Sequence, residues 1–476
     1  LTQLGRVEAA RSGIRLNTDA IDNSAGVDTS DHEVNIKILL DGFVKSGELS
    51  EDDRNALLAQ MTDAVADAVL ADNYAQNVVL GNARAVAPSM ITVHERMITE
   101  LGRVGLLNRA LESLPDDAEL ETRDLAGQGL TSPELSVLLA YAKIQLTSAL
   151  ADGALAQDPW FEIMLRRYFP AEIVDRYGRQ LASHPLKGRI IDTVAVNALV
   201  NTGGITFVFR AMEETGASIV EVVKAATVTM EIFGIEDSWS LINSLDNVVP
   251  TSVQDALHLE LRRLLDRATR WFLQTRGADI DVAEQISRFG PIIRDYAAQV
   301  PPALRGAQAA RYEQNRGRFM ALGVPAHIAD SIAAGLDVFS LLDIKEVASR
   351  TGEDPSTLIP LYFSIMDRYD IDSILVRITG LGRGDRWSVL ARQALRADLY
   401  GVVAGLTSRI SRATSPSAAP DARIDAWESA HAAGLARARA TLHEIAQQED
   451  ADLATLSVAL RVMRNLVAQG TASTLE

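Results

Sequence analysis

The sequence contains no cysteine among its 476 residues. Disulfide bonds and thiolate metal sites are therefore excluded, and the absence fits a reducing cytoplasm, where we expect the protein to be located. Lysine is also scarce, because six of the 46 basic residues are lysine and the other 40 are arginine. We interpret this bias as the codon usage of a GC-rich genome and not as chemistry.

The chain also lacks the features of nucleic-acid-binding and membrane proteins. The 46 Lys and Arg are outnumbered by 63 Asp and Glu, and no long basic run is present. Because phosphate binding needs clustered cations, we expect no nucleic-acid partner. No apolar run reaches the length of a membrane span, so we expect a soluble protein with no membrane partner. The chain starts at Leu1 without a signal-peptide pattern, and we expect it to be a piece of a longer polypeptide.

The residues that are present predict a mainly α-helical fold. With 47% hydrophobic and 23% charged residues, the composition is globular, and the length suggests more than one domain. Thr131 and Glu134 form a capping-box pattern with Pro133 in the first turn, followed by an apolar stripe at helical spacing. Strand-like alternation is rare after residue 20. We therefore predict a multi-helix domain preceded by a small α/β remnant, which includes a brief strand from Ile14.

The most linker-like segment lies near the C-terminus. Residues 412–423, RATSPSAAPDAR, are rich in Ala, Ser and Pro. Two amphipathic helices are predicted after it, over about 422–446 and 449–469.

Two other patterns invite a binding role and are better explained by structure. An apolar run precedes Gly380, Gly382 and Gly384, but the full glycine spacing of a dinucleotide site and its strand context are missing. The glycines therefore indicate a link between helices. Four arginines share one predicted helix with acidic neighbours, which favours a solvated or salt-bridged face. These arginines are Arg262, Arg263, Arg267 and Arg270.

Histidine gives no sign of a metal site. The seven histidines are scattered, and none has a partner histidine at helical spacing. We therefore expect no bound metal.

The candidate site is an acidic, small-residue stretch near the start, NTDAIDNSAGVDTSDHEV, over residues 17–34. It offers Asn23, a Ser-Ala-Gly turn that lets a ligand approach the backbone, and a predicted helix start at Ser30, where Glu33 completes a capping box. A helix N-terminus favours a carboxylate or a phosphate. An ordinary strand–loop–helix junction explains the same pattern and is favoured by the local sequence alone.

Longer segments resemble the large NAD-specific glutamate dehydrogenases. The first forty residues are similar to the final segment of their dehydrogenase domain, and the resemblance continues in order along the chain until about Thr414. The later segments that carry it are RNALLAQMTDAVADAVLADNYAQN, GLTSPELSVLLAYAKIQL, LVNTGGITFVFRAMEETGAS, ELRRLLDRATRWF and DRWSVLARQALRADLY.

The opening stretch also resembles the smaller glutamate dehydrogenases, which read P-D-x-x-x-N-A-G-G-V-x-x-S at this place. Asn23, Gly26, Val27 and Ser30 match that pattern, whereas the two residues after Asn23 depart from it. The resemblance implies that Asn23 contacts the nicotinamide end of NAD. It implies likewise that Ser30 contacts the distal carboxylate of glutamate, with Gly26 and Val27 beside it.

The resemblance also implies an organisation for the whole chain. Residues 1–115 are expected to complete the catalytic region, and residues 116–476 to form a helical domain for assembly or regulation. The catalytic Lys and Asp and the glycine-rich pyrophosphate turn are expected upstream of Leu1, so this chain alone should be inactive. Expected partners are copies of itself in a homo-oligomer such as a tetramer, the upstream catalytic domain, and a regulatory protein or amino-acid effector. The alternative is a non-catalytic helical interaction module.

Overall fold

The computed structural model describes residues 1–278, 280–382, 385–446 and 452–468. Over these residues the chain is helical and contains no strand, which confirms the mainly α fold. The small α/β remnant is not seen there. Residues 14–18, where a strand was expected, form a non-helical link without strand pairing between two helices, α1 (Gln3–Arg11) and α2 (Asp19–Asp22).

The chain divides into two compact units. Unit 1 comprises Leu1–Thr227 and Arg276–Ala283, and unit 2 comprises Val228–Thr275 and Glu284–Glu476. The predicted boundary near residue 115 was a boundary between functional regions. It stays a prediction, because the compact units are divided near residue 227 and do not test it. Besides α1 and α2, unit 1 includes α3 (Ala25–Ser46), α4 (Glu51–Gln60), α5 (Thr62–Val86), α6 (Ile91–Arg103), α7 (Asp117–Leu125), α8 (Ser132–Leu150), α9 (Glu162–Tyr168), α10 (Ala171–Tyr177), α11 (Lys187–Gly203) and α12 (Phe207–Thr215).

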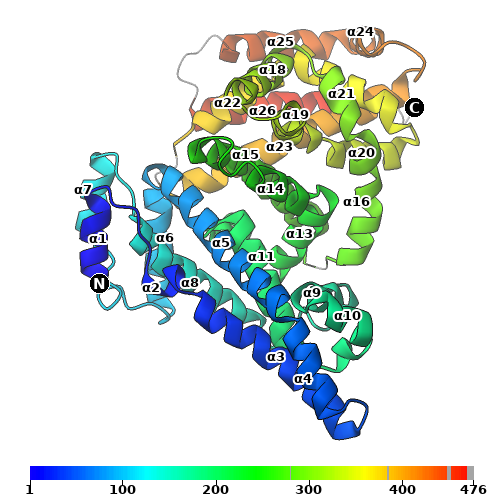
Figure 1. Ribbon diagram of the computed structural model, residues 1–476. Coiled ribbons are helices and arrows are strands. Elements are labelled where there is room, and N and C mark those ends of the chain that lie inside the picture. Colours follow the sequence, from blue (N-terminus) through cyan, green and yellow to red (C-terminus); the bar gives the residue numbers. More distant parts are fainter. Residues whose placement is uncertain (279, 383–384, 447–451, 469–476) are drawn as a thin grey trace. The chain divides into compact units, whose positions relative to one another are not determined.

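The centre of unit 1 is built from four helices that are far apart in sequence. The long helices α3 and α5 lie side by side (Figure 1), and α5 also packs on α8 and α11. The capping box predicted for α8 is confirmed, since Glu134 accepts from the backbone N–H of Thr131 at 2.7 Å. Arg123 then binds both oxygens of buried Glu134 at 2.9 Å. The start of α8 is thereby held in the core.

Unit 2 is a second helical body. The helix α13 (Ile219–Ile232) has residues in both units. Unit 2 further includes α14 (Ile235–Asn243), α15 (Thr251–Arg276), α16 (Val282–Tyr296), α17 (Val300–Ala303), α18 (Gly306–Ala321), α19 (Ala326–Val338), α20 (Leu341–Thr351), α21 (Pro355–Arg368), α22 (Ile371–Gly380), α23 (Arg386–Ala413), α24 (Pro420–Ala430), α25 (Ala432–Ala446) and α26 (Leu453–Ala468). Apolar side chains at helical spacing along α15 are buried, from Val253 to Trp271.

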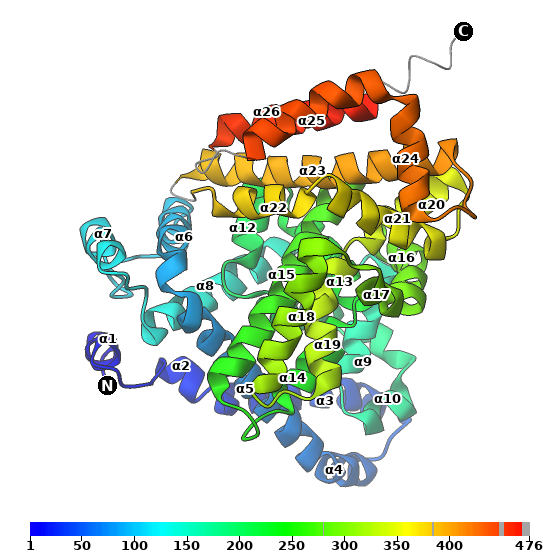
Figure 2. The ribbon, with the colours of Figure 1, turned by 90° about the horizontal axis from the view of Figure 1, so that it is seen from above.

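The C-terminal helices pack on the 28-residue helix α23. Figure 2 shows α23, α25 and α26 side by side, and α26 contacts both of the others. The segment predicted as one helix over 422–446 is two helices with a break at His431. The second predicted helix is confirmed as α26, and its expected ends at 449–451 and 469 lie outside the described residues.

The glycine-rich segment is a helix link, as predicted. Gly380 is the last residue of α22, and Arg386 is the first of α23. Gly384 lies outside the described residues. Because the apolar run before Gly380 is helical, the segment lacks the strand that a dinucleotide fingerprint follows.

No single helix in the described part of the chain is long and apolar enough to cross a membrane. By length and composition, one bent pair, α11 with α12, passes the same test when the two are taken together.

Candidate functional site

The helix that carries the candidate site begins earlier than predicted. The first residue of α3 is Ala25 and its N-cap is Ser24, so the capping box expected at Ser30 and Glu33 is wrong. The turn of α2 before Ser24 lets the helix start six residues sooner, because the N-cap is Ser24 and not Ser30. Ser30 therefore lies in the second turn, where backbone N–H groups already bond within the helix. A ligand at this position would meet the Ser30 hydroxyl and not a free helix N-terminus.

All four residues that the sequence singled out are exposed. Asn23 is the C-cap of α2, and Gly26, Val27 and Ser30 follow at helical spacing on one side of α3. The side chain of Val27 is 78% exposed. The structure thus brings the four residues together at the exposed start of α3. Their contacts with cofactor and substrate stay predictions.

The segment is held in place by residues that sequence reasoning missed. Asn73 of α5 donates its side-chain amide to Ile21 O at 2.9 Å and to Ser24 Oγ at 2.8 Å. On the other side, the buried Arg6 pairs with Asp19 and donates to Asn17 O at 2.8 Å. Two separate elements therefore position the short turn that presents Asn23.

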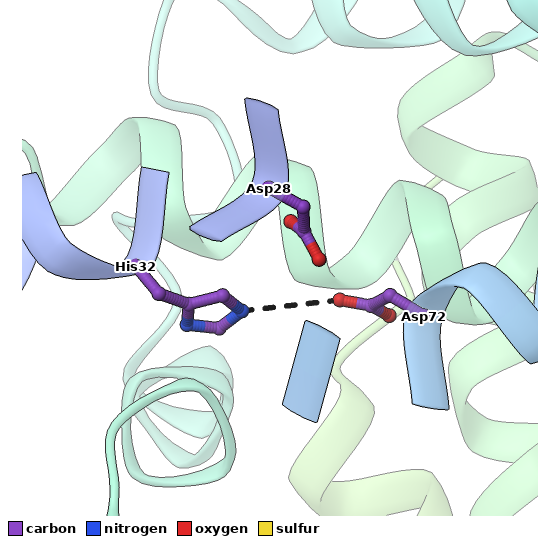
Figure 3. A group of neighbouring side chains, drawn as sticks. All are labelled: Asp28, His32 and Asp72. Atoms are coloured by element: carbon purple, nitrogen blue, oxygen red, sulfur yellow. Dashed lines mark ion pairs between the residues drawn. The ribbon is translucent and has the colours of Figure 1, made fainter. Parts of the chain in front are cut away.

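The opposite face of α3 carries a cluster of titratable groups. Asp28 and buried His32 lie one turn apart on α3, and Asp72 approaches from α5 (Figure 3). One ligand atom from each of the three residues lies within 4.8 Å of the others. The Nε2 atom of His32 is 3.9 Å from Asp72 Oδ2, which is too long for a hydrogen bond. The three side chains thus surround a common point without closing on one another.

Helix α9 orients this cluster through a tyrosine. The ring of Tyr168 stacks on His32, with centroids 4.5 Å apart. Its hydroxyl donates to Asp31 Oδ2 and accepts from Asn35 Nδ2, both at 2.8 Å. The backbone carbonyl of Asn35 in turn bonds to His184 Nε2 at 3.0 Å. The imidazole plane of His32 is therefore set by neighbours from outside α3.

Comparison with known proteins identifies the family. Residues 127–465 match the family described as "Glutamate dehydrogenase, C-terminal", which covers more than half of the chain. The chain belongs to this glutamate dehydrogenase family. Residues 1–83 match a second description, "Bacterial NAD-glutamate dehydrogenase, catalytic domain".

Three curated relatives are each named NAD-specific glutamate dehydrogenase. The protein of Mycobacterium tuberculosis is 41% identical over 466 residues, that of Pseudomonas aeruginosa 38% and that of Halomonas elongata 36%. Each alignment covers 98% of this chain and 29% of the relative. The chain therefore spans less than a third of the length of these glutamate dehydrogenases.

Unit 1 contains the segment that matches the catalytic domain and the beginning of the segment that matches the C-terminal family. Asp28, His32 and Asp72 lie in the segment that matches the catalytic domain. Tyr168 and Lys143 lie in the segment that matches the C-terminal family. A site at α3 would accordingly draw side chains from both.

The charges of the cluster shift the pKa values of its members. Burial, reinforced by the neighbouring Asp72, raises the pKa of Asp28 to about 6. Burial lowers the pKa of Lys143 on α8 to about 8, against the opposing pull of Asp72 and Asp28. For His32, burial is outweighed by the carboxylates of Asp72 and Asp28, which raise its pKa. Such shifts are typical of functional sites, although ion-pair networks also produce them.

Sequence reasoning considered only pairs of histidines and therefore overlooked this cluster. The signal within reach was the Asp28-x-x-x-His32 spacing, which places both side chains on one helix face. Asp72 joins through the packing of α3 on α5, which no local pattern encodes.

Proposed function

We propose that this chain is the C-terminal part of an NAD-dependent glutamate dehydrogenase. The full-length enzyme would convert glutamate, NAD and water to 2-oxoglutarate, ammonia and NADH in the cytoplasm. The observation that carries the proposal is the exposed start of α3, within the segment matching the catalytic domain, where Gly26, Val27 and Ser30 lie on one side of the helix and exposed Asn23 directly precedes it. The names of the three relatives support the same activity.

In this proposal the chain supplies one wall of the active site. NAD would accept the hydride from the glutamate Cα when bound. The Asn23 side-chain amide would bond to the carboxamide of the nicotinamide and so orient the ring. The Ser30 hydroxyl would donate to the distal carboxylate of glutamate, while Gly26, which has no Cβ, lets the substrate approach the helix and Val27 contacts it. The groups that exchange protons with the substrate would come from the upstream catalytic domain, so the isolated chain is expected to be inactive.

The test is Ser30→Ala in the full-length enzyme. Losing one charge-assisted hydrogen bond costs about 1.5–3 kcal/mol, which raises the KM for glutamate roughly 10- to 150-fold. Ser46→Ala, at the other end of α3, is the matched control and should leave KM unchanged. An unchanged KM in Ser30→Ala would remove Ser30 from the site and favour the non-catalytic interaction module.

A second variant separates the cofactor from the substrate. Asn23→Ala should raise the KM for NAD by about tenfold, because the nicotinamide loses a hydrogen bond, and should change the KM for glutamate less. Equal changes in both constants would mean that Asn23 supports the local backbone and does not contact NAD.

For the helical domain of residues 116–476 we propose a role in assembly or regulation, within a homo-oligomer such as a tetramer that responds to an amino-acid effector or a regulatory protein. The support is that a buried charged pair of unit 2, Arg423 with Glu353, is occupied internally and joins two segments of the helical domain. Deleting residues 420–468 from the full-length enzyme should leave the KM for glutamate unchanged and lower the mass of the assembly in sedimentation. Unaltered assembly and regulation would refute this role.

A further inference from the structure

We propose that Asp28, His32 and Asp72 bind one divalent transition-metal ion of the Zn²⁺ type. The three side chains come from two helices and present one ligand atom each, all within 4.8 Å of one another (Figure 3). Zn²⁺ binds nitrogen and oxygen ligands at about 2.0–2.2 Å, which places neighbouring ligand atoms about 3–3.5 Å apart. Side-chain rotations that shorten the separations by about 1 Å would therefore complete three bonds to an ion.

A second observation concerns Asp28 alone. Its Oδ2 atom is buried and has no hydrogen-bond partner in the described part of the chain. Burying a carboxylate oxygen without a hydrogen bond or a coordinated ion is costly. In Figure 3 the Asp28 carboxylate is directed toward the space between His32 and Asp72. A bound ion would satisfy this oxygen and neutralise both carboxylates.

The ligand set decides which class of ion fits. One imidazole nitrogen with two carboxylates suits Zn²⁺, Co²⁺ or Fe²⁺, whereas Mg²⁺ and Ca²⁺ prefer oxygen ligands alone. The ring of His32 is oriented by stacking on Tyr168, as metal-binding imidazoles commonly are by their neighbours. The side chain of Asp72 is 40% exposed, so an ion can enter from solvent. Three protein ligands leave at least one coordination position for water.

Substitution of Lys143 should strengthen metal binding, which distinguishes a metal site from a purely structural cluster. The ammonium group of Lys143 interacts electrostatically with Asp72 and Asp28 and therefore competes with an ion for the same carboxylates. Lys143→Met should strengthen Zn²⁺ binding, by about tenfold for one competing charge. An unchanged zinc affinity in Lys143→Met would overturn the assignment of the bound ion to these carboxylates.

The experiment measures bound metal in the full-length protein after removal of metal by a chelator. Zn²⁺ is titrated against a chromophoric competitor, and Co²⁺ is followed by its visible spectrum. Asp28→Asn and Asp72→Asn should each lose one bound ion per chain, or weaken its binding by at least about tenfold. Asp67→Asn, an exposed carboxylate on the same helix as Asp72, is the matched control and should bind as the wild type. Mg²⁺ at the same concentration should not displace Co²⁺.

A second measurement locates the ion without any substitution. Bound Fe²⁺ with ascorbate and peroxide cleaves the backbone close to the ion, so fragments ending near residues 28–32 and 72 support the site. Cleavage elsewhere overturns it, as would wild-type protein without stoichiometric metal, or metal binding that both variants retain. Because no readout depends on enzymatic activity, failure of the metal site and failure of the glutamate dehydrogenase proposal are distinguishable.

Discussion

Two carboxylate groups with little solvent exposure at their oxygen atoms, Asp28 of unit 1 and Glu353 of unit 2, have opposite surroundings. Burial raises the pKa of Asp28 to about 6, and the nearby Asp72 adds to the effect. Burial also acts on Glu353, but bonds from Arg423, Ser411 and Thr357 outweigh it and lower the pKa of Glu353. The cost of burying the carboxylate is thus offset by hydrogen-bond partners at Glu353, whereas at Asp28 it is not fully offset.

This difference in surroundings distinguishes a charged pair that stabilises the fold, Arg423 with Glu353, from carboxylates that are available to a ligand, Asp28 and Asp72. Arg423 grips both oxygens of Glu353, at 2.6 and 2.8 Å, and the two side chains are only 1% and 5% exposed. This pair joins the link after α20 to α24 and has no open face. In the cluster of Asp28, His32 and Asp72, the side chain of Asp72 is 40% exposed, and Asp28 has a buried oxygen without a hydrogen-bond partner among the described residues. The geometry of this cluster can accept an ion or a proton, whereas that of the arginine pair cannot.

The largest expected effect comes from breaking the closed pair. Arg423→Ala leaves Glu353 buried without its cation, so the free energy of unfolding of unit 2 should fall by about 3–5 kcal/mol. Denaturant titration of the full chain would measure the loss.

The control for this variant is an exposed ion pair of the same chemistry. Arg305 binds Asp421 at 2.8 Å, and Arg305→Ala should cost about 0–1 kcal/mol because solvent screens the pair. Equal losses in the two variants would show that burial does not decide the strength of these pairs, and the comparison would fail.

The next effect concerns a titratable group that is kept neutral. His258 of α15 stacks on Trp239 at 4.1 Å, and neither ring nitrogen has a hydrogen-bond partner in the described chain. Burial, with a smaller contribution from Arg262, lowers the pKa of His258 to about 3. His258 is therefore protonated below about pH 6.5 in the unfolded chain, but only below about pH 3 in the folded chain. Stability is fully present above pH 6.5 and is lost as the pH falls toward 3.

Replacing this histidine should remove that loss. Between pH 7 and 4.5, His258→Leu should lose about 2–3 kcal/mol less stability than the wild type. The exposed His327 provides the control, since His327→Gln should follow the wild-type slope. A parallel slope in His258→Leu would mean that the imidazole is charged in the folded chain.

Local patterns predicted the helices well and their ends less well. The capping box at Thr131 and the buried stripe of α15 were predictable because each depends on residues within a few turns. The start of α3 was missed because the short helix α2 precedes it and supplies a different N-cap. The break at His431 was missed because no glycine or proline marks it.

The residues of the candidate site also differ in whether the sequence could reveal them. The exposed residues Asn23 and Ser30 stand in one contiguous motif, so a resemblance could single them out. Asn73, Asp72 and Tyr168 reach the same helix from α5 and α9, and only tertiary packing reveals them. Their roles depend on distances across helices, which sequence spacing does not contain.

A smaller effect is expected where unit 1 relies on a neutral partner. Asn73→Ala removes two hydrogen bonds to the turn before α3 and should cost about 1–2 kcal/mol locally. Amide exchange of residues 21–24 should speed up by about tenfold or more, because that free energy controls local opening. Gln76→Ala, on the same helix, should leave exchange unchanged, since its amide donates to the backbone carbonyl of Asp72 on that helix. Unchanged exchange in Asn73→Ala would mean that Arg6 alone holds the turn.

The smallest effect lies on the exposed face of α3 and sharpens the contrast with Glu353. Lys37 donates to Glu33 Oε2 at 3.1 Å, one turn apart and both exposed. Glu33→Ala should cost only about 0.3–0.5 kcal/mol in denaturant titration of the isolated chain, as exposed pairs on a helix do. In the full-length enzyme the same substitution tests whether this face stays open. In the full-length enzyme, a loss well above about 1 kcal/mol would mean that another part of the protein covers and desolvates the Lys37–Glu33 pair. Ser30, one turn before Glu33, would then be covered as well.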